Sequence, residues 1–171
     1  MAYTLSVSAK VSLSSLLQNA LDLSTPEDSL PFEFSDTLAT GVGLDGANRV
    51  WHDERTIATG ADDDLDLSGV LVDAFGAAIL FATIRAIIIH NKGTGVADIL
   101  DVGAEGTNVF INWVGDATDK IRIGPGGLFF LWNPSAAGYA VTAGTGDKLR
   151  IKNNGTGDTV YQIILVGSTA A

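Results

Sequence analysis

The sequence contains no cysteine among its 171 residues. This absence excludes disulfide bonds, thiolate nucleophiles and metal sites built from cysteine ligands. Histidine is almost as scarce, with only His52 and His90, and no Gly-x-Ser-x-Gly motif occurs, so nucleophilic catalysis has few candidate residues. The stability of the chain must therefore come from packing, with assembly as a further source.

Positive charge is also in short supply. Ten lysine and arginine residues stand against 20 aspartate and glutamate residues, which gives a net charge of −10 and a pI of about 4.3. Affinity for DNA or RNA depends on basic side chains that neutralise phosphates, so the balance argues against a nucleic-acid partner. Charged residues make up 18% and hydrophobic residues 46%, which is too apolar for a disordered chain. The length fits one folded domain.

Long uninterrupted hydrophobic runs are missing. Residues 70–89 come nearest to a membrane span, but they include Asp73 and Arg85, each of which costs about 2.5–3.5 kcal/mol at the centre of a span. The first residues show no basic segment followed by an apolar one, so we expect no secretory signal and no membrane partner. On this interpretation the protein is made in the cytoplasm and stays there unless it leaves inside something larger.

Glycine is abundant, with 20 residues, and it separates many short apolar segments. Segments at intervals of roughly 8–12 residues are typical of an all-β sandwich or barrel. The predicted fold class is therefore all-β, with a β-sandwich or jelly-roll-like body, and helical turns are expected only near Leu16 and over residues 70–75. The predicted body strands are 49–58, 64–68, 79–90, 97–102, 108–113, 119–123, 127–132, 139–142, 147–152 and 159–166.

The N-terminal region has a different pattern. Apolar and polar residues alternate over residues 3–13 and again over 30–35, which indicates two half-buried strands. Residues 16–23 show no clear period and predict a helical turn or an irregular crossing, closed by a turn at 25–29. A glycine-rich stretch at 40–46 reads as a joint. We predict an arm with its joint over residues 1–46 and a body over 47–171.

The arm is the predicted partner-binding element. A two-stranded ribbon with an apolar row is barely stable alone, so we expect it to pack on another subunit, and its removal to abolish assembly. Extended arms often bind by adding a strand to a neighbour. The predicted contact residues are Tyr3, Leu5, Val7, Val11, Leu13, Phe32 and Phe34.

Two further patterns concern the body. Residues 89–95 resemble residues 151–157, since both contain Asn-x-Gly-Thr-Gly, and they predict two similar hairpin turns in which Asn and Gly adopt positive φ. Apolar residues on both faces predict that segments 84–89 and 163–166 lie centrally in the sheets or at a subunit interface. The residues expected to be buried are Phe81, Ile84, Ile87, Ile89, Ile121, Ile123, Leu149, Ile151, Ile163 and Leu165.

His52 is the most suggestive candidate for acid–base chemistry because it stands next to Asp53 and Glu54. On an alternating strand, however, Trp51 and Asp53 share one face while His52 and Glu54 share the other. A surface or interface ladder is the simpler interpretation, since a general base also needs a reacting group within reach. The predicted interface residues are Trp51, His52, Asp53 and Arg55.

The densest acidic cluster is Asp62, Asp63, Asp64 and Asp66. Several carboxylates could hold Ca²⁺, but an EF-hand pattern is absent, and a solvated loop is the preferred interpretation, with cation binding left open. The Gly-Thr-Gly sequences at 93–95, 144–146 and 155–157 lack the spacing of a phosphate-binding loop and predict turns. No cofactor is expected.

Several blocks of the sequence carry a resemblance. They are residues 49–56, 64–69 with 73–76, 112–120 and 138–145. Together they resemble a family of structural proteins of tailed bacteriophages and prophages, encoded among head and tail genes. The resemblance implies a non-enzymatic virion component, in the manner of a jelly-roll decoration or cement protein, and it implies no particular functional residues.

The resulting hypothesis is an oligomeric protein, a trimer or dimer, that decorates or cements a phage capsid. Its expected partners are copies of itself and the major capsid protein or another virion protein, and its expected location is the virion. The alternative is a tail, collar or head spike or fibre module that binds the host surface. A cell-wall or polysaccharide hydrolase is a third reading, which would need a carboxylate pair across a groove.

Overall fold

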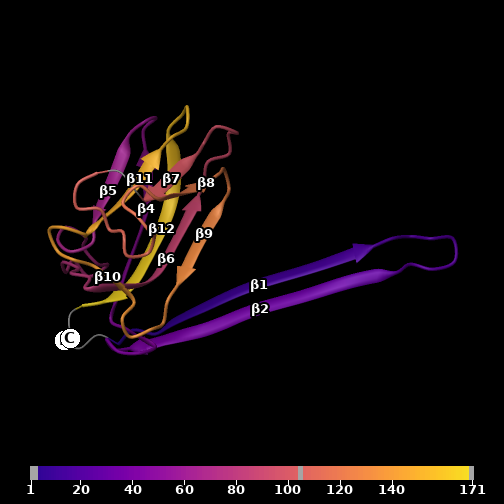
Figure 1. Cartoon of the computed structure of the whole chain (residues 1–171), viewed down its shortest axis with the longest axis horizontal. Coiled ribbons are helices and arrows are strands. Elements are labelled where there is room, and N and C mark those ends of the chain that lie inside the picture. Colours follow the sequence, from indigo (N-terminus) through magenta and orange to yellow (C-terminus); the bar gives the residue numbers. More distant parts are fainter. Residues whose placement is uncertain (1–3, 104–105, 170–171) are drawn as a thin grey trace.

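The computed structural model describes residues 4–103 and 106–169. Within these ranges every regular element is a β-strand, which confirms the predicted all-β class. Figure 1 shows a sandwich-like body from which a long two-stranded arm projects. Tyr3, a predicted contact residue, lies outside the described residues.

Two sheets form the body. The first, called sheet I, has the order β10-β6-β12-β4, with β9 paired to β6, and the second, called sheet II, has the order β5-β11-β7-β8. The strands of sheet I are β4 (Arg49–Ile57), β6 (Thr83–Asn91), β9 (Leu128–Trp132), β10 (Tyr139–Ala140) and β12 (Thr159–Ser168). The strands of sheet II are β5 (Asp62–Asp66), β7 (Leu100–Gly103), β8 (Lys120–Ile123) and β11 (Lys148–Asn153).

One apolar cluster joins the inner faces of the two sheets. Its central strands are β6 and β12, whose residues 84–89 and 163–166 are apolar on both faces except for Arg85, and their central place is one that the sequence predicts. Ile121 is the exception among the residues expected to be buried, because it is 39% exposed on the edge strand β8. The confirmed core residues of that set are Phe81, Ile84, Ile87, Ile89, Ile123, Leu149, Ile151, Ile163 and Leu165.

Two predicted segments of the body are wrong in detail. Residues 108–113 are not a strand: Asn108 has a φ of 62°, and only Val109 forms a bridge, to Lys148. Phe110 is nevertheless fully buried, so its apolar character reflects burial in irregular chain. Residues 70–75 contain no helical turn. There the Asp73 side chain accepts hydrogen bonds from the backbone N–H groups of Phe75 and Ala77 and closes a tight turn.

The two similar Asn-x-Gly-Thr-Gly segments form matching turns, but the prediction of hairpins is wrong, because each segment links a strand of one sheet to a strand of the other, β6 to β7 and β11 to β12. The cause of the turns also differs from the one expected. Neither turn uses a positive φ at its asparagine or its glycines. Asn91 and Asn153 are both fully buried, and each accepts a 2.9 Å hydrogen bond from the glycine N–H two residues later. Their amide groups donate to backbone carbonyls inside the body, so each turn is held from within.

The arm is a hairpin of β1 (Val7–Gln18) and β2 (Glu27–Thr40), paired antiparallel along their full lengths. Both strands are longer than predicted. The segment expected to be a helical turn or crossing continues β1 through Leu16 and Leu17, and the reversal lies at residues 19–26 instead of 25–29. The pairing continues because each residue to Gln18 finds a partner on β2. A short strand, β3 (Gly46–Ala47), pairs with the end of β2.

Candidate interaction surface

The register of the arm separates apolar from polar side chains. Val11 lies opposite Phe34, Leu13 opposite Phe32 and Ser15 opposite Leu30. Because side chains alternate along a strand, these pairs share one face of the hairpin with Leu17. We call this set the apolar stripe: Val11, Leu13, Leu17, Leu30, Phe32 and Phe34.

The opposite face of the arm is mostly polar. Its paired positions include Lys10 with Ser35, Ser12 with Glu33, and Gln18 with Glu27. Lys10 and Glu33 form an ion pair on this face. Leu16 is the large apolar exception, and it lies opposite Ser29. The hairpin is therefore amphipathic along its length.

The apolar stripe is open to solvent. Leu13 is 58% exposed, Leu17 72% and Phe32 53%. None of residues 11–34 is buried, because the hairpin extends away from the body instead of lying on it (Figure 1). Isolated two-stranded hairpins are marginally stable in water, and a contiguous exposed apolar patch is typical of an interaction site. Four stripe residues, Val11, Leu13, Phe32 and Phe34, are contact residues that the sequence predicts, whereas Leu17 and Leu30 join the stripe only through the register of the hairpin.

At its base the same face of the arm packs on the body. Leu38 and Ala47 are buried against Ala86 and Val166 of sheet I. Four partly buried residues complete this second apolar cluster: Leu5, Val7, Val50 and Trp132. Leu5 and Val7 therefore contact the chain's own body, while the stripe beyond them is free of it.

Hydrogen bonds fix the direction of the arm. Trp132 Nε1 donates to Asp36 Oδ2 at 2.8 Å, and the Asp45 N–H donates to the Pro134 carbonyl at 2.9 Å. Arg85, which is fully buried, donates from Nη2 to the carbonyls of Val42, Gly43 and Ala136 at 2.7–3.3 Å. Burial lowers the pKa of Arg85. Because the arm is held before binding, less conformational entropy is lost on association.

The outer face of sheet I contains three cross-strand rows. The first row is Val50, Val166, Ala86 and Trp132, and the base of the arm covers it. The second row is His52, Ile164, Ile88 and Phe130. The third row is Glu54, Gln162, His90 and Leu128.

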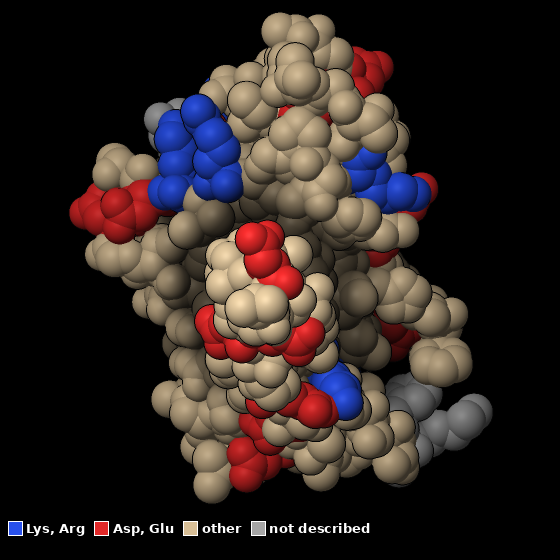
Figure 2. Space-filling model, turned by 90° about the vertical axis from the view of Figure 1, so that its right-hand side faces the viewer, with Lys and Arg blue, Asp and Glu red and all other residues tan. Residues whose placement is uncertain are grey.

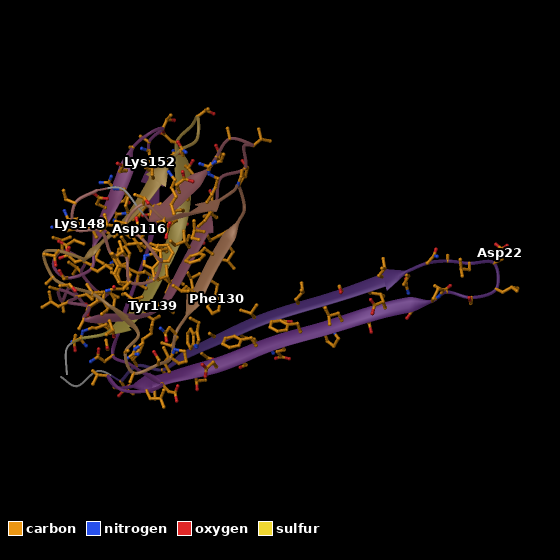
Figure 3. The ribbon with its side chains drawn as sticks, viewed as in Figure 1. Asp22, Asp116, Phe130, Tyr139, Lys148 and Lys152 are labelled. Atoms are coloured by element: carbon orange, nitrogen blue, oxygen red, sulfur yellow. The ribbon has the colours of Figure 1, made fainter. Side chains whose placement is uncertain are left out.

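Apolar side chains are exposed in the second and third rows. Ile164 is 38% exposed and Leu128 66% exposed, while Ile88 and Phe130 are half-buried. We call these four residues the apolar patch. A shallow hollow of about 380 Å³ is lined by Ile88, His90, Gly126, Leu128, Gln162 and Ile164. Figure 3 shows Phe130 on the side of the body from which the arm projects.

The third row also carries a polar network beside the patch. Gln162 Nε2 and Lys92 Nζ both donate to Glu54 Oε2 at 2.9 Å. The hydrogen bond from Lys92 is the main cause that lowers the pKa of Glu54. The partners of Glu54, which follows His52 by two residues, are therefore Lys92 and Gln162. These polar side chains form a border along the apolar patch.

The predicted interface residues on β4 separate into two groups. His52 and Asp53 are exposed, so they remain available to a partner. Trp51 is only 6% exposed and belongs to the core, so its prediction as an interface residue is wrong. Arg55 is half-buried and donates to Asp63 of sheet II at 2.6 and 3.1 Å. Its position on the inner face turns it toward the opposite sheet.

The acidic cluster is a strand rather than a solvated loop. Asp62, Asp64 and Asp66 on β5 lie opposite Lys152, Arg150 and Lys148 on β11, and Arg150 binds Asp64 with two hydrogen bonds of 2.6 and 2.7 Å. The hydrogen bonds from Arg150 hold the pKa of Asp64 below its usual value. Lys148 and Lys152 lie on the side of the body away from the arm (Figure 3). Cross-strand cations thus engage Asp62 and Asp64, whereas Asp66 accepts hydrogen bonds from Ser68.

Charge distinguishes the arm from the body. Residues 7–40 hold five acidic side chains and one basic side chain, a formal net charge of −4. Figure 2 looks along the arm and shows acidic side chains on it, with lysine and arginine side chains on the body above it. A negative arm favours a positively charged surface on a partner.

No protein-family model, curated protein or solved structure matches this chain. Among the residues that the structure describes, no group of three or more His, Asp or Glu side chains could hold a metal ion. The same residues include no helix long and apolar enough to cross a membrane.

Sequence reasoning located the stripe but missed the patch and the tethers. The stripe was visible because alternation with period two needs only local sequence. The patch combines residues from β6, β9 and β12, and Arg85 bonds to carbonyls more than 40 residues away along the chain. An arginine inside an otherwise apolar strand was the one signal that pointed to a buried polar tether.

Proposed function

We propose that this chain is a non-enzymatic structural protein that joins a larger assembly through its arm. The observation that carries the proposal is the apolar stripe, exposed on a hairpin that the body holds in a fixed direction. An amphipathic hairpin gains stability when its apolar face is covered, and its unpaired edges can accept a further strand. Binding to a neighbouring subunit would cover the apolar face of the hairpin and could also pair its free strand edges.

The proposed assembly is the virion of a tailed bacteriophage. The resemblance of residues 49–56, 64–69 with 73–76, 112–120 and 138–145 to phage head and tail proteins supports this choice. In the proposed role, an oligomer decorates or cements the capsid, with the arm contacting copies of this chain or the major capsid protein. The net charge of −10 favours a basic site on the shell.

The test uses a shortened hairpin. Residues 11–34 are replaced by Asn-Gly, so that Lys10 and Ser35, which are paired in the structure, flank a two-residue turn. The cut keeps Val7, Leu38 and the Asp36–Trp132 hydrogen bond, and it removes no buried residue. It is a cleaner test than deleting residues 1–39, which would uncover Ala86 and Val166.

The full chain and the shortened chain are mixed with particles that lack the protein, at low and high salt. We expect the full chain to bind in stoichiometric amounts and to stabilise the shell to heat, with binding weakened by salt because surface charges are screened. The shortened chain should stay folded and fail to bind. Equal binding by both chains would overturn the proposed role of the arm. Binding to host cells without binding to the shell would favour the spike or fibre alternative.

A further inference from the structure

The base of the arm shows what the stripe can pack on. Val7 and Leu38 share a face with the stripe, and they contact Val166 and Ala86 in the first row of sheet I. The stripe continues this arm face outward with the same kinds of side chain. The apolar patch likewise continues the first row across sheet I through Ile164 and Ile88. The apolar stripe thus extends the arm side of the contact within the chain, and the apolar patch extends the sheet I side of the same contact.

A chain does not cover its own patch. In the described part of the chain, the arm packs on the first row of sheet I and then projects away from the body (Figure 1), so it leaves the apolar patch uncovered. Both surfaces remain exposed in one copy, with Leu13 at 58% and Leu128 at 66%. In a second copy of the chain, a patch is available to cover the stripe and a stripe is available to cover the patch.

The areas are sufficient for a specific contact. The stripe and the patch together expose apolar surface on the order of 700 Å², close to the ~800 Å² that each partner contributes to a standard interface. Two copies that exchange arms would bury both surfaces on each copy. Phe32 and Phe34 are the largest side chains of the stripe, and the hollow between Leu128 and Ile164 suits anchors of that kind.

We infer that a second copy of this chain occupies this surface, with the apolar stripe of one copy packed on the apolar patch of the other. The inference rests on the proposed function and names the partner of the same arm. The polar border formed by Glu54, Gln162 and Lys92 limits the contact on one side, and the covered first row limits it on the other. The area of sheet I on which the stripe packs is therefore bounded on both sides.

The experiment uses four full-length single variants. Leu13→Lys places a charge in the stripe, and Ile164→Glu places a charge in the patch. Leu16→Lys is the matched control, because Leu16 has the same 58% exposure as Leu13 but lies on the polar face of the arm. Leu128→Glu repeats the patch test on β9, where Leu128 is 66% exposed, so we expect the fold to accept a charge there.

Self-association is measured by analytical ultracentrifugation over a range of concentrations, with circular dichroism as the check of folding. We expect Leu13→Lys, Ile164→Glu and Leu128→Glu each to weaken association by at least about tenfold, and Leu16→Lys to change it by less than about twofold. Mixing Leu13→Lys with Ile164→Glu should restore association, because the intact arm of the second can pack on the intact patch of the first.

Other outcomes would overturn the inference. Loss of association in Leu13→Lys with wild-type behaviour in both patch variants would mean that arms pack on arms. A wild-type chain that remains monomeric would exclude the self-contact, and binding to particles would still decide the proposed function separately. Failure of the mixture to associate, with both variants folded, would exclude the pairing of stripe and patch.

Discussion

The phenolic hydroxyl of Tyr161, on β12 in sheet I, donates a 2.9 Å hydrogen bond to Oδ2 of Asp63, on β5 in sheet II. The bond joins the two layers of the body through a fully buried side chain. Burial, together with the negative charge of Asp63, raises the pKa of Tyr161. Asp63 also accepts two hydrogen bonds from Arg55, so one carboxylate links three strands.

Asp63→Asn should therefore destabilise the body. The substitution keeps the size of the side chain but removes the charge that Arg55 and Tyr161 share, and we expect a loss of about 1–3 kcal/mol in the free energy of unfolding. Asp53→Asn is the control, since exposed Asp53 also binds Arg55, at 3.1 Å, and should cost less than about 1 kcal/mol. Denaturant titration compares the two, and equal losses would contradict the inter-sheet role.

Asp101 should make the free energy of unfolding depend on pH in the acidic range. Its carboxylate is almost fully buried and accepts hydrogen bonds from Arg122 and Asn154, and those from Arg122 are the main cause that lowers its pKa from 3.8. A depressed pKa in the folded state stabilises the protein above the unfolded value, and this contribution is lost as the pH falls below about 4. We expect Asp101→Asn to be less stable than wild type at pH 6, with the difference shrinking by pH 3. A difference that stays constant with pH would contradict this.

Asn153 should be essential to its turn. Its Nδ2 donates to the carbonyls of Ile57 and Gly157, and its Oδ1 accepts from the Gly155 N–H. Asn153→Ala leaves these buried groups without partners and should cost about 1–3 kcal/mol or more of unfolding free energy. Thr156→Ala, at an exposed position of the same turn, should change it by less than about 0.5 kcal/mol. Thermal unfolding of both variants tests the difference.

Ile87 and Ile88 are neighbours in β6 with opposite roles. Ile87 is fully buried in the core, whereas Ile88 belongs to the half-exposed apolar patch. Ile87→Asp places an unpaired charge in the core and should abolish soluble folded protein. Ile88→Asp should yield a folded chain by circular dichroism. Normal folding of the Ile87 variant would show that the face assignment of β6 is wrong.

Much of the fold was predictable because its signals are local. Alternation over residues 3–13 and 30–35 predicted the two arm strands, and apolar runs separated by glycine predicted most of the body strands. The prediction failed where partners decide the conformation. Leu16 and Leu17 continue β1 because β2 lies opposite them, and Asp62 and Asp64 lie in β5 because β11 supplies cations.

The sequence by itself determined that this is an all-β chain with an amphipathic N-terminal arm, because side-chain alternation and turn residues act over a few positions. Only the tertiary structure decided that Trp51 is buried in the core, that Asp63 joins the sheets, and that Ile88, Phe130 and Ile164 form one exposed patch. These outcomes depend on which strands become neighbours. Strand order arises from packing the whole body at once, and no short segment of sequence encodes it.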